Sequence, residues 1–224
     1  MRNIIVAALL SVSSLSAATI LGFGAEADYF APEASGHFSY TDKGVTTNTS
    51  FNGNTESSYQ VGFYFEHPVP ILPNLRVDLT PNTEFSGKDG VVASTVKFNQ
   101  IDVTPYYEIL DNIVDLDIGI TLKVLDGSVS GTANQDFTQV IPMGYLGAAL
   151  MIPGLPISFA GSIKYIGTGG DSLSDSRVKV VWDIAAGLKA QAGYREESLK
   201  VDNRFDINAD ATFKGPFVGL SYQF

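Results

Sequence analysis

Apolar and polar residues alternate along much of this chain, most clearly from Val114 to Val124. Every second residue of that segment is apolar, whereas the positions between them include Asp115, Asp117 and Lys123. Successive side chains of a strand point to opposite faces, so a strand separates these two sets cleanly. A helix would instead spread the charges around its whole surface. The segment is therefore predicted to be a β-strand with one apolar face.

About ten segments show this alternation. Their faces can be assigned except in Val140–Met151, which is apolar on both sides. A different division there or around Leu188 would change the count to eight or twelve. The ten segments are 21–29, 59–66, 75–80, 100–109, 114–124, 140–151, 157–165, 177–184, 188–195 and 218–224.

The links between the segments alternate in length. Outer-membrane barrels have short periplasmic turns and longer outer loops, and a tilted spanning strand needs about 9–11 residues. Backbone groups inside lipid must all be paired, so the sheet has to close. The expected fold is all-β, a closed antiparallel up-and-down transmembrane β-barrel of about ten strands. The short links are 67–74, 110–113, 152–156 and 186–188, and the longer polar links are 32–57, 87–94, 126–139, 167–176 and 202–210.

Periodicity alone also permits a soluble barrel that keeps its apolar face inside. Aromatic placement and the two ends of the chain favour the membrane form. Aromatic residues concentrate at membrane interfaces, and most aromatic residues of the predicted apolar faces fall near segment ends. These residues are Tyr29, Phe65, Phe85, Tyr107, Tyr165, Trp182, Tyr194 and Tyr222.

The final strand, 218–224, has an apolar face that ends on an aromatic residue. This pattern resembles the C-terminal signal read by the outer-membrane assembly machinery, in which the last residue and the residue two before it are aromatic. The candidate assembly signal comprises Gly219, Tyr222 and Phe224. The match is incomplete, because Phe217 stands where the signal usually has a polar residue.

Residues 1–17 are arranged like a secretory signal peptide, with Arg2 before an apolar run and small residues around a cleavage site after residue 17 or 18. The run is too short for a membrane-spanning helix, which needs about 20 residues. We therefore expect export, removal of residues 1–17 and a barrel over residues 18–224 in the bacterial outer membrane.

The composition fits an exported barrel. The 224-residue chain has 14 Lys and Arg against 24 Asp and Glu, a net charge of −10, and no cysteine. Nucleic-acid binding requires clustered cations, so no nucleic-acid partner is expected. Without disulfides the protein depends on its own hydrogen bonds and packing. No linker or composition break divides the chain, which favours a single domain.

One hairpin carries a family resemblance. Residues 66–74, EHPVPILPN, resemble the first periplasmic turn of a family of small outer-membrane β-barrel proteins of Gram-negative bacteria. Residues 31–36 and 215–217 are also similar. The resemblance implies an outer-membrane barrel and no established activity. The expected partners of such a barrel are outer-membrane lipid and lipopolysaccharide, the assembly machinery and periplasmic chaperones.

Candidate catalytic residues are few. The two histidines, His37 and His67, fall near opposite ends of the predicted barrel, which makes a shared site unexpected. A protease of the ten-stranded omptin type would need acidic pairs and a His–Asp element at the outer rim, but Asp115 and Asp117 adjoin a periplasmic turn. Asp206–Asp210 begins like a calcium loop and lacks the required glycine and glutamate. We expect no enzyme, cofactor or metal site.

The predicted inward faces carry many charges. Either these charges pair into a network that fills the barrel, or they line a thin cation-preferring pore, because acids outnumber bases ten to seven. We favour filling, since the interior of a small barrel is just wide enough for side chains. The candidate lumen charges are Glu26, Asp28, Arg76, Asp78, Asp102, Asp115, Asp117, Lys123, Lys179 and Arg195, with Glu66, Glu84, Glu108, Lys164, Arg177, Asp183 and Lys189 on the same faces.

The sequence therefore predicts a structural or surface-interaction barrel. Its outer loops, chiefly 32–57, would contact lipopolysaccharide, host surfaces or phage. The alternatives are a narrow cation-preferring passive channel for small solutes and, least favoured, an outer-membrane enzyme.

Overall fold

The computed structural model describes residues 21–69, 71–204 and 207–224, so the predicted signal peptide lies outside the described residues. No helix in the described residues is long and apolar enough to cross a membrane. The strands are β1 (Gly22–Phe30), β2 (Glu33–Asp42), β3 (Val45–Thr55), β4 (Ser58–Glu66), β5 (Asn74–Asp89), β6 (Val92–Leu110), β7 (Val114–Ser130), β8 (Asn134–Met151), β9 (Ile157–Thr168), β10 (Asp171–Ala185), β11 (Leu188–Arg204) and β12 (Ile207–Gln223).

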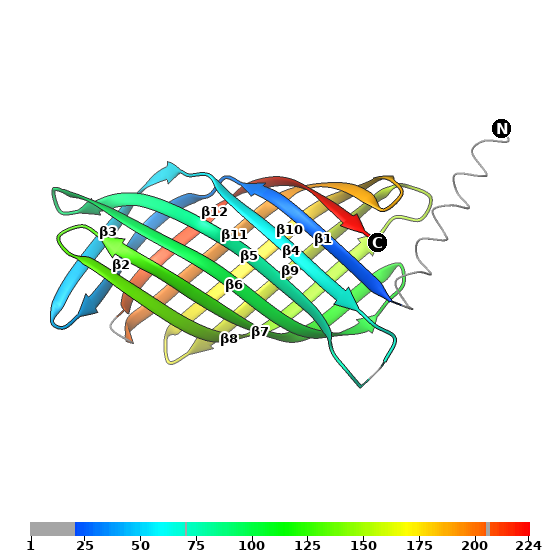
Figure 1. Cartoon of the computed structure of the whole chain (residues 1–224), viewed down its shortest axis with the longest axis horizontal. Helices are drawn as coiled ribbons and strands as arrows, with labels where there is room; N and C mark the ends of the chain where they lie inside the picture. The colour runs from blue at the N-terminus through cyan, green and yellow to red at the C-terminus, as the bar shows by residue number, and fades with distance from the viewer. Residues whose placement is uncertain (1–20, 70, 205–206) are drawn as a thin grey trace.

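Ten of these strands close an antiparallel barrel, which confirms the predicted fold class (Figure 1). β1 lies between β4 and β12, and the ring continues from β4 through β5 to β12 in chain order. The other two strands, β2 and β3, form a hairpin between β12 and β5. They continue the wall beyond β1 and β4. The break between β1 and β2 falls at Ala31 and Pro32, where proline cannot donate to the ladder.

The chain ends and the turns define two rims of the barrel. Gly24 pairs with Gln223, so both described chain ends lie at one rim, here called the proximal rim (Figure 1). The opposite rim is called the distal rim, and the corresponding halves of the barrel are the proximal and distal halves. The proximal rim holds turns 67–73, 111–113, 152–156 and 186–187, and the distal rim holds turns 43–44, 90–91, 131–133 and 169–170.

The longer links are not loops, which corrects the sequence-based prediction. Link 32–57 contains β2 and β3, and link 126–139 contains the ends of β7 and β8, so the distal turns are tight. The alternation continues through these links, but here the apolar residues point inward and the polar residues point outward. The exposed polar residues make the links look like loops in the sequence. At the β2–β3 turn, Lys43 and Gly44 have φ angles of 48° and 81°, as a two-residue type I′ hairpin turn requires.

The structure also assigns the faces that the sequence left open. In β8, Met143 and Tyr145 point inward and are 2% and 9% exposed, whereas Leu146 and Leu150 point outward. Both faces of this segment look alike because the inward face also lacks charged residues, with Ile141, Met143 and Gly147 among its members.

One sequence-based assignment is wrong. Glu84 is predicted inward and Phe85 outward in a girdle, but Phe85 is 1% exposed inside the barrel and Glu84 pairs with Lys97 on the outside. The pairing of β5 with β6 shifts between Thr80 and Thr83. Such a bulge moves every later side chain to the other face.

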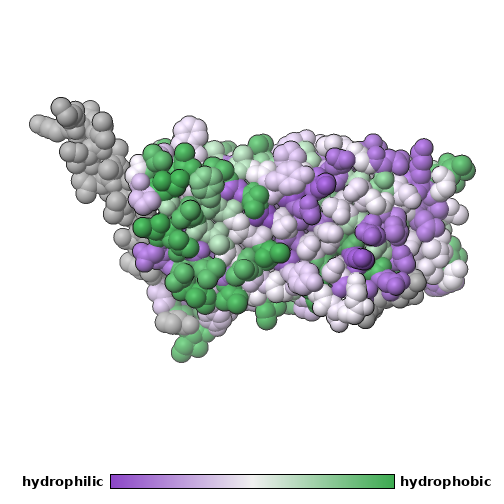
Figure 2. All heavy atoms as spheres, turned by 180° about the vertical axis from the view of Figure 1, so that it is seen from behind, coloured by the Kyte–Doolittle hydropathy of each residue, from purple (hydrophilic) through white to green (hydrophobic). Residues whose placement is uncertain are grey.

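The outer surface of the proximal half is an apolar belt. Figure 2 shows apolar side chains gathered toward the proximal end of the barrel, with polar side chains toward the opposite end. A soluble barrel would keep these side chains inside. Members of the belt include Phe63, Ile118, Ile120, Leu122, Phe159, Val178, Val180, Trp182 and Leu220, all more than a third exposed.

The charged interior as candidate functional site

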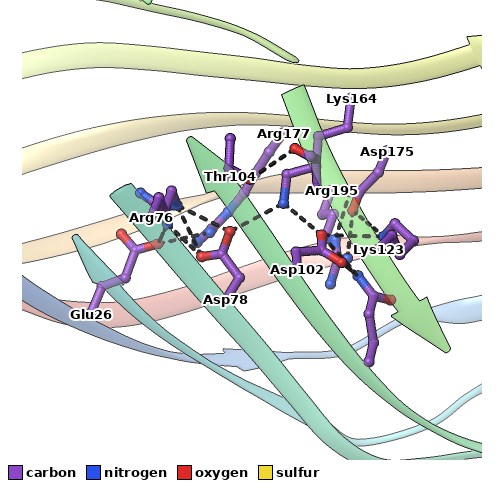
Figure 3. A network of polar contacts seen from close by, with 12 residues as sticks. Glu26, Arg76, Asp78, Asp102, Thr104, Lys123, Lys164, Asp175, Arg177 and Arg195 are labelled. Carbon is purple, nitrogen blue, oxygen red and sulfur yellow. Dashed lines mark hydrogen bonds and ion pairs between the residues drawn. The ribbon is translucent and has the colours of Figure 1, made fainter. Parts of the chain in front are cut away.

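The centre of the barrel holds a network of buried ion pairs, here called the interior charge network (Figure 3). Its twelve charged side chains come from seven strands around the barrel and are at most 20% exposed. The six acids are Glu26, Asp28, Asp78, Asp102, Asp175 and Glu197, and the six bases are Arg76, Lys123, Lys164, Arg177, Lys179 and Arg195.

Lys123 organises one side of the network. Its Nζ lies 3.0 Å from Asp175 Oδ2, 3.2 Å from Glu197 Oε1 and 3.4 Å from Asp102 Oδ2, and its side chain is fully buried. Arg195 donates to both oxygens of Asp175 at 2.9 and 2.8 Å and to Glu197 at 3.2 Å. The planar guanidinium matches a carboxylate in this bidentate geometry.

Glu26 organises the other side. Its carboxylate accepts from Arg76, from Arg177 at 3.0 Å and from Lys179 at 2.8 Å. Arg177 also pairs with Asp28, the other β1 acid. β1 therefore supplies two acids that bind bases from β5 and β10, on opposite sides of the barrel interior.

Lys164 joins the two sides. Its Nζ lies 3.1 Å from Asp78 Oδ2 and 2.6 Å from Asp102 Oδ2, and Asp78 accepts from Arg76 at 3.0 and 3.1 Å (Figure 3). The network is consequently continuous across the lumen. With six acids and six bases it is formally neutral. Paired charges of this kind avoid the large cost of isolated buried ions.

Of the first ten candidate lumen charges named from the sequence, eight lie in this network, and Asp115 and Asp117 do not. These two carboxylates sit near the proximal rim, where Asp115 accepts from the backbone N–H of Asn112 at 3.2 Å. Glu66 is also there and accepts from the Tyr106 hydroxyl at 3.0 Å. Asp183 is about half exposed and pairs with Lys189 at 3.3 Å. The surplus of acids over bases therefore lies outside the network.

Sequence reasoning missed Asp175 and Glu197, which complete the network. Asp175 lies in link 167–176, and Glu197 lies beyond the segment assigned to its strand. Both could have been found, because Asp175 is two residues from Arg177 and Glu197 is two residues from Arg195. Each therefore shares the inward face of its neighbour.

Aromatic rings cover the network on its distal side. The guanidinium carbon of Arg177 lies 4.2 Å from the centre of the Phe217 ring, and that of Arg195 lies 5.5 Å from the centre of the Phe30 ring. A cation over an aromatic face is attracted by the ring quadrupole. Phe217, the residue that departs from the usual assembly signal, is 3% exposed and has this internal role.

The distal half of the lumen is filled by an apolar core, here called the distal core. Phe85 and Phe213 lie at its centre with ring centroids 4.5 Å apart. The buried members are Ala34, Phe38, Phe51, Phe85, Val96, Val129, Phe137, Ile207, Ala209, Ala211 and Phe213.

Hairpins meet over the distal rim. Gln135 Nε2 donates to the carbonyl of Val45 at 2.6 Å, which joins β8 to the β2–β3 turn. Asp89 accepts from the Thr132 hydroxyl at 2.6 Å and from Asn48 at 3.5 Å, which adds the β5–β6 turn. These bonds bring three separate hairpins together at the mouth.

The three assembly-signal residues have distinct surroundings. A Cβ on Gly219 would lie 2.0 Å from Asp28 Oδ1, so only glycine leaves room for that network acid. Tyr222 and Phe224 point outward at the proximal rim with ring centroids 4.7 Å apart, and the Phe224 N–H donates to Phe23 O at 2.8 Å. Their reading by the assembly machinery stays a prediction.

The remaining candidates for chemistry lie apart. His37 Nε2 is 3.2 Å from Asn208 Oδ1 in the distal half, whereas His67 lies in a proximal turn. Asp206 of the calcium-loop prediction lies outside the described residues. Among the residues that the structure describes, no group of three or more His, Cys, Asp or Glu is placed to hold a metal ion.

The fold is that of known outer-membrane β-barrels. The outer-membrane protease OmpT from Escherichia coli superposes with a TM-score of 0.56 at 10% identity, covering 91% of this chain and 97% of that chain. Neisserial surface protein A gives a TM-score of 0.40 at 13% identity, covering 90% of this chain and 97% of that chain. Ail of Yersinia pestis gives 0.39 at 10% identity, with 92% and 99% covered. No protein-family model matches the sequence, and no curated protein matches it either.

Proposed function

We propose that this chain is a non-conducting integral barrel of the bacterial outer membrane with a structural or surface-interaction role and no enzymatic activity. The observation that carries the proposal is the occupied interior. A neutral network of six acids and six bases spans the lumen, and the distal core lies above it. A permeating ion would have to break buried ion pairs and then cross an apolar layer, both of which are costly.

The apolar belt supports insertion in a membrane. Ile120 and Trp182 are 59% and 57% exposed, and they belong to a continuous apolar surface of a kind that soluble proteins avoid. In lipid the same surface is solvated by acyl chains. Strands β5 to β8 have 16 to 19 residues, whereas about 9–11 suffice to span the bilayer. We therefore place the distal half outside the membrane.

The wall of the distal half supports a surface-interaction role. On β3, the side chains of Thr46, Asn48, Ser50 and Asn52 are all exposed, and Lys214 is exposed on β12. Hydroxyl and amide groups hydrogen-bond with sugars, and lysine pairs with phosphate. The partner that fits this wall is lipopolysaccharide around the barrel, together with saccharides presented at the distal turns.

The route to the membrane belongs to the same proposal. It comprises export through residues 1–17, delivery by periplasmic chaperones and recognition of the last strand by the assembly machinery. Membership of the small-barrel family with the EHPVP…LPN hairpin is also part of it.

Single-channel recording tests the proposal against the channel alternative. The mature chain would be refolded, its barrel verified by heat-modifiable migration on a gel, and its insertion verified by flotation with lipid vesicles. We expect inserted protein to give no steady current above that of the lipid alone, because the network and the distal core fill the lumen.

A steady cation-selective current from inserted protein would contradict the proposal. The variants Asp117→Asn and Asp183→Asn form a matched pair for that outcome, since one acid lies on the inward face and the other is half exposed at the rim. A current reduced by the first variant alone would place the conduction path through the acidic proximal lumen.

A further inference from the structure

The turn between β4 and β5 has an apolar surface. The side chains of Val69, Ile71 and Leu72 are 48%, 84% and 56% exposed, and they are here called the turn tip. Residues 68–73 include no charged side chain. The neighbouring proximal turn 111–113, by contrast, holds Asp111 and Asn112.

Hydrogen bonds join the described residues of this turn to one another. The backbone N–H of Val69 donates to His67 Nδ1 at 3.2 Å, which leaves the proton on Nε2 to be donated to Pro73 O, also at 3.2 Å. The N–H of Leu72 donates to Val69 O at 3.2 Å, and the N–H of His67 donates to Asn74 Oδ1 at 3.0 Å. A turn ordered in advance loses little conformational entropy when it binds a partner.

The turn bends toward the lipid-facing side of the barrel. The hydroxyl of Tyr107 donates to Ile71 O at 3.0 Å, and Tyr107 points outward from β6 with 43% exposure. The His67 ring lies 6.0 Å from the ring of Phe65, another outward aromatic residue. Figure 1 shows the β4–β5 connection projecting sideways from the wall near the proximal rim. The turn tip is therefore continuous with the apolar belt.

We propose that the turn tip inserts into the periplasmic leaflet of the outer membrane and anchors the barrel at that interface. Lipid is the partner that fits, because the turn is apolar, uncharged and joined to the belt by aromatic residues that favour the interface. Burial of apolar side chains at the boundary between headgroups and acyl chains is favourable. The inference rests on the proposed membrane location and adds a contact made by a turn rather than by the strands.

Tryptophan quenching tests the anchor. Trp182 is the only tryptophan in the chain and lies in the belt, so it reports on the belt itself. The variant Ile71→Trp in a Trp182→Phe background moves the reporter to the turn tip. In vesicles of phosphatidylcholine brominated near the top of the acyl chains, we expect it to lose emission by roughly two-fold or more relative to unbrominated vesicles, with a shift to shorter wavelength.

A matched control places the reporter on a polar turn at the same rim. Asn112→Trp in the same background should keep its emission in brominated vesicles, because position 112 follows the charged Asp111. Quenching of Ile71→Trp no stronger than that of Asn112→Trp would overturn the anchor, whether the tip met water, a second copy or another protein.

The experiment separates this inference from the proposed function. If Trp182 of the unchanged chain is quenched while Ile71→Trp is not, the barrel is in the membrane and only the anchor is wrong. If Trp182 itself is not quenched, the membrane location fails and the anchor fails with it. Heat-modifiable migration of each variant verifies that the barrel is folded before it is measured.

Discussion

The two halves of this barrel are built from the same strands with opposite polarity. Along β7, the proximal half points Ile118 and Ile120 outward and Lys123 inward, whereas the distal half points Asp126 outward and Val129 inward. β12 reverses in the same way, from an inward Phe213 in the distal half to an outward Leu220 in the proximal half. The period of two never changes along either strand. What changes is the face on which the apolar residues lie.

The reversal teaches that the surroundings of a strand, rather than the strand itself, decide which face is apolar. Outside the membrane, water drives apolar side chains into the lumen and a core forms as in a soluble barrel. In the membrane location proposed for the proximal half, lipid is as apolar as the side chains, so no hydrophobic gain comes from filling the lumen with leucine. The lumen of the proximal half holds paired charges instead, and hydrogen bonds and ion pairs rather than apolar contacts hold its side chains together.

The largest effect should come from removing the central base of the proximal half. We expect Lys123→Met to lower the free energy of unfolding by about 5 kcal/mol, the upper end for breaking a buried ion pair, because three carboxylates within 3.4 Å lose their partner. Urea titration of the barrel in lipid vesicles, followed by Trp182 fluorescence, measures the change.

The matched control is Lys97→Met, which removes the same charge from a pair in the distal half. Lys97 and Glu84 are 57% and 48% exposed, so this variant should cost about 0–1 kcal/mol. Equal effects at positions 123 and 97 would mean that the interior network does not hold the proximal half together.

The next effect belongs to the distal core. Phe85 is 1% exposed and packs against Phe213, so Phe85→Ala should cost about 3–4 kcal/mol through lost burial and the remaining cavity. Phe63→Ala removes the same ring from the belt, where lipid can fill the space, and should cost clearly less. The same urea titration compares them, and a larger loss at Phe63 would contradict a water-driven core in the distal half.

Much of the proximal half could be predicted from the sequence. In this half the apolar residues point outward and the charged residues point inward, so the sequence alternates clearly, as from Asp115 to Lys123. Because a period of two fixes which residues share a face, it placed Glu26, Asp28, Arg76 and Lys123 on inward faces. Their partners could not be derived, since the pairings join strands that are far apart in sequence, such as β1 with β10.

The distal half escaped prediction for two physical reasons. Its strands expose Ser, Thr and Asn, so their outward faces resemble loops, and the apolar positions alone, such as Phe38 and Phe51, were too sparse to indicate strands. The bulge at Asn82 then moved Phe85 inward. Pro81 and Asn82 could have indicated it, because proline inside a strand favours a bulge and asparagine tolerates a positive φ. A search for continued alternation beyond each clear strand would have extended most of them.

The smallest effect on stability is expected at the distal rim. The hydrogen bond from Thr132 lowers the pKa of Asp89, with a further contribution from Asn48. A carboxyl group whose pKa is lower in the folded protein stabilises it above the ordinary carboxyl pKa, and this contribution disappears as the pH falls through the lowered value. Asp89→Ala should remove the contribution at neutral pH and loosen the contact between turns 90–91 and 131–133, with little change in global stability.

Hydrogen exchange can detect so local a change. The N–H of Gly131 donates to Ala133 O at 3.1 Å, and its exchange should become faster by about two- to five-fold in Asp89→Ala, while amides of the distal core stay protected. Asp126→Ala is the control, because Asp126 accepts from Thr138 at 2.7 Å on the outer wall and joins no hairpins across the mouth. If both variants accelerate hydrogen exchange at the Gly131 amide equally, Asp89 does not link the hairpins, and their contact depends on Gln135 and Val45 instead.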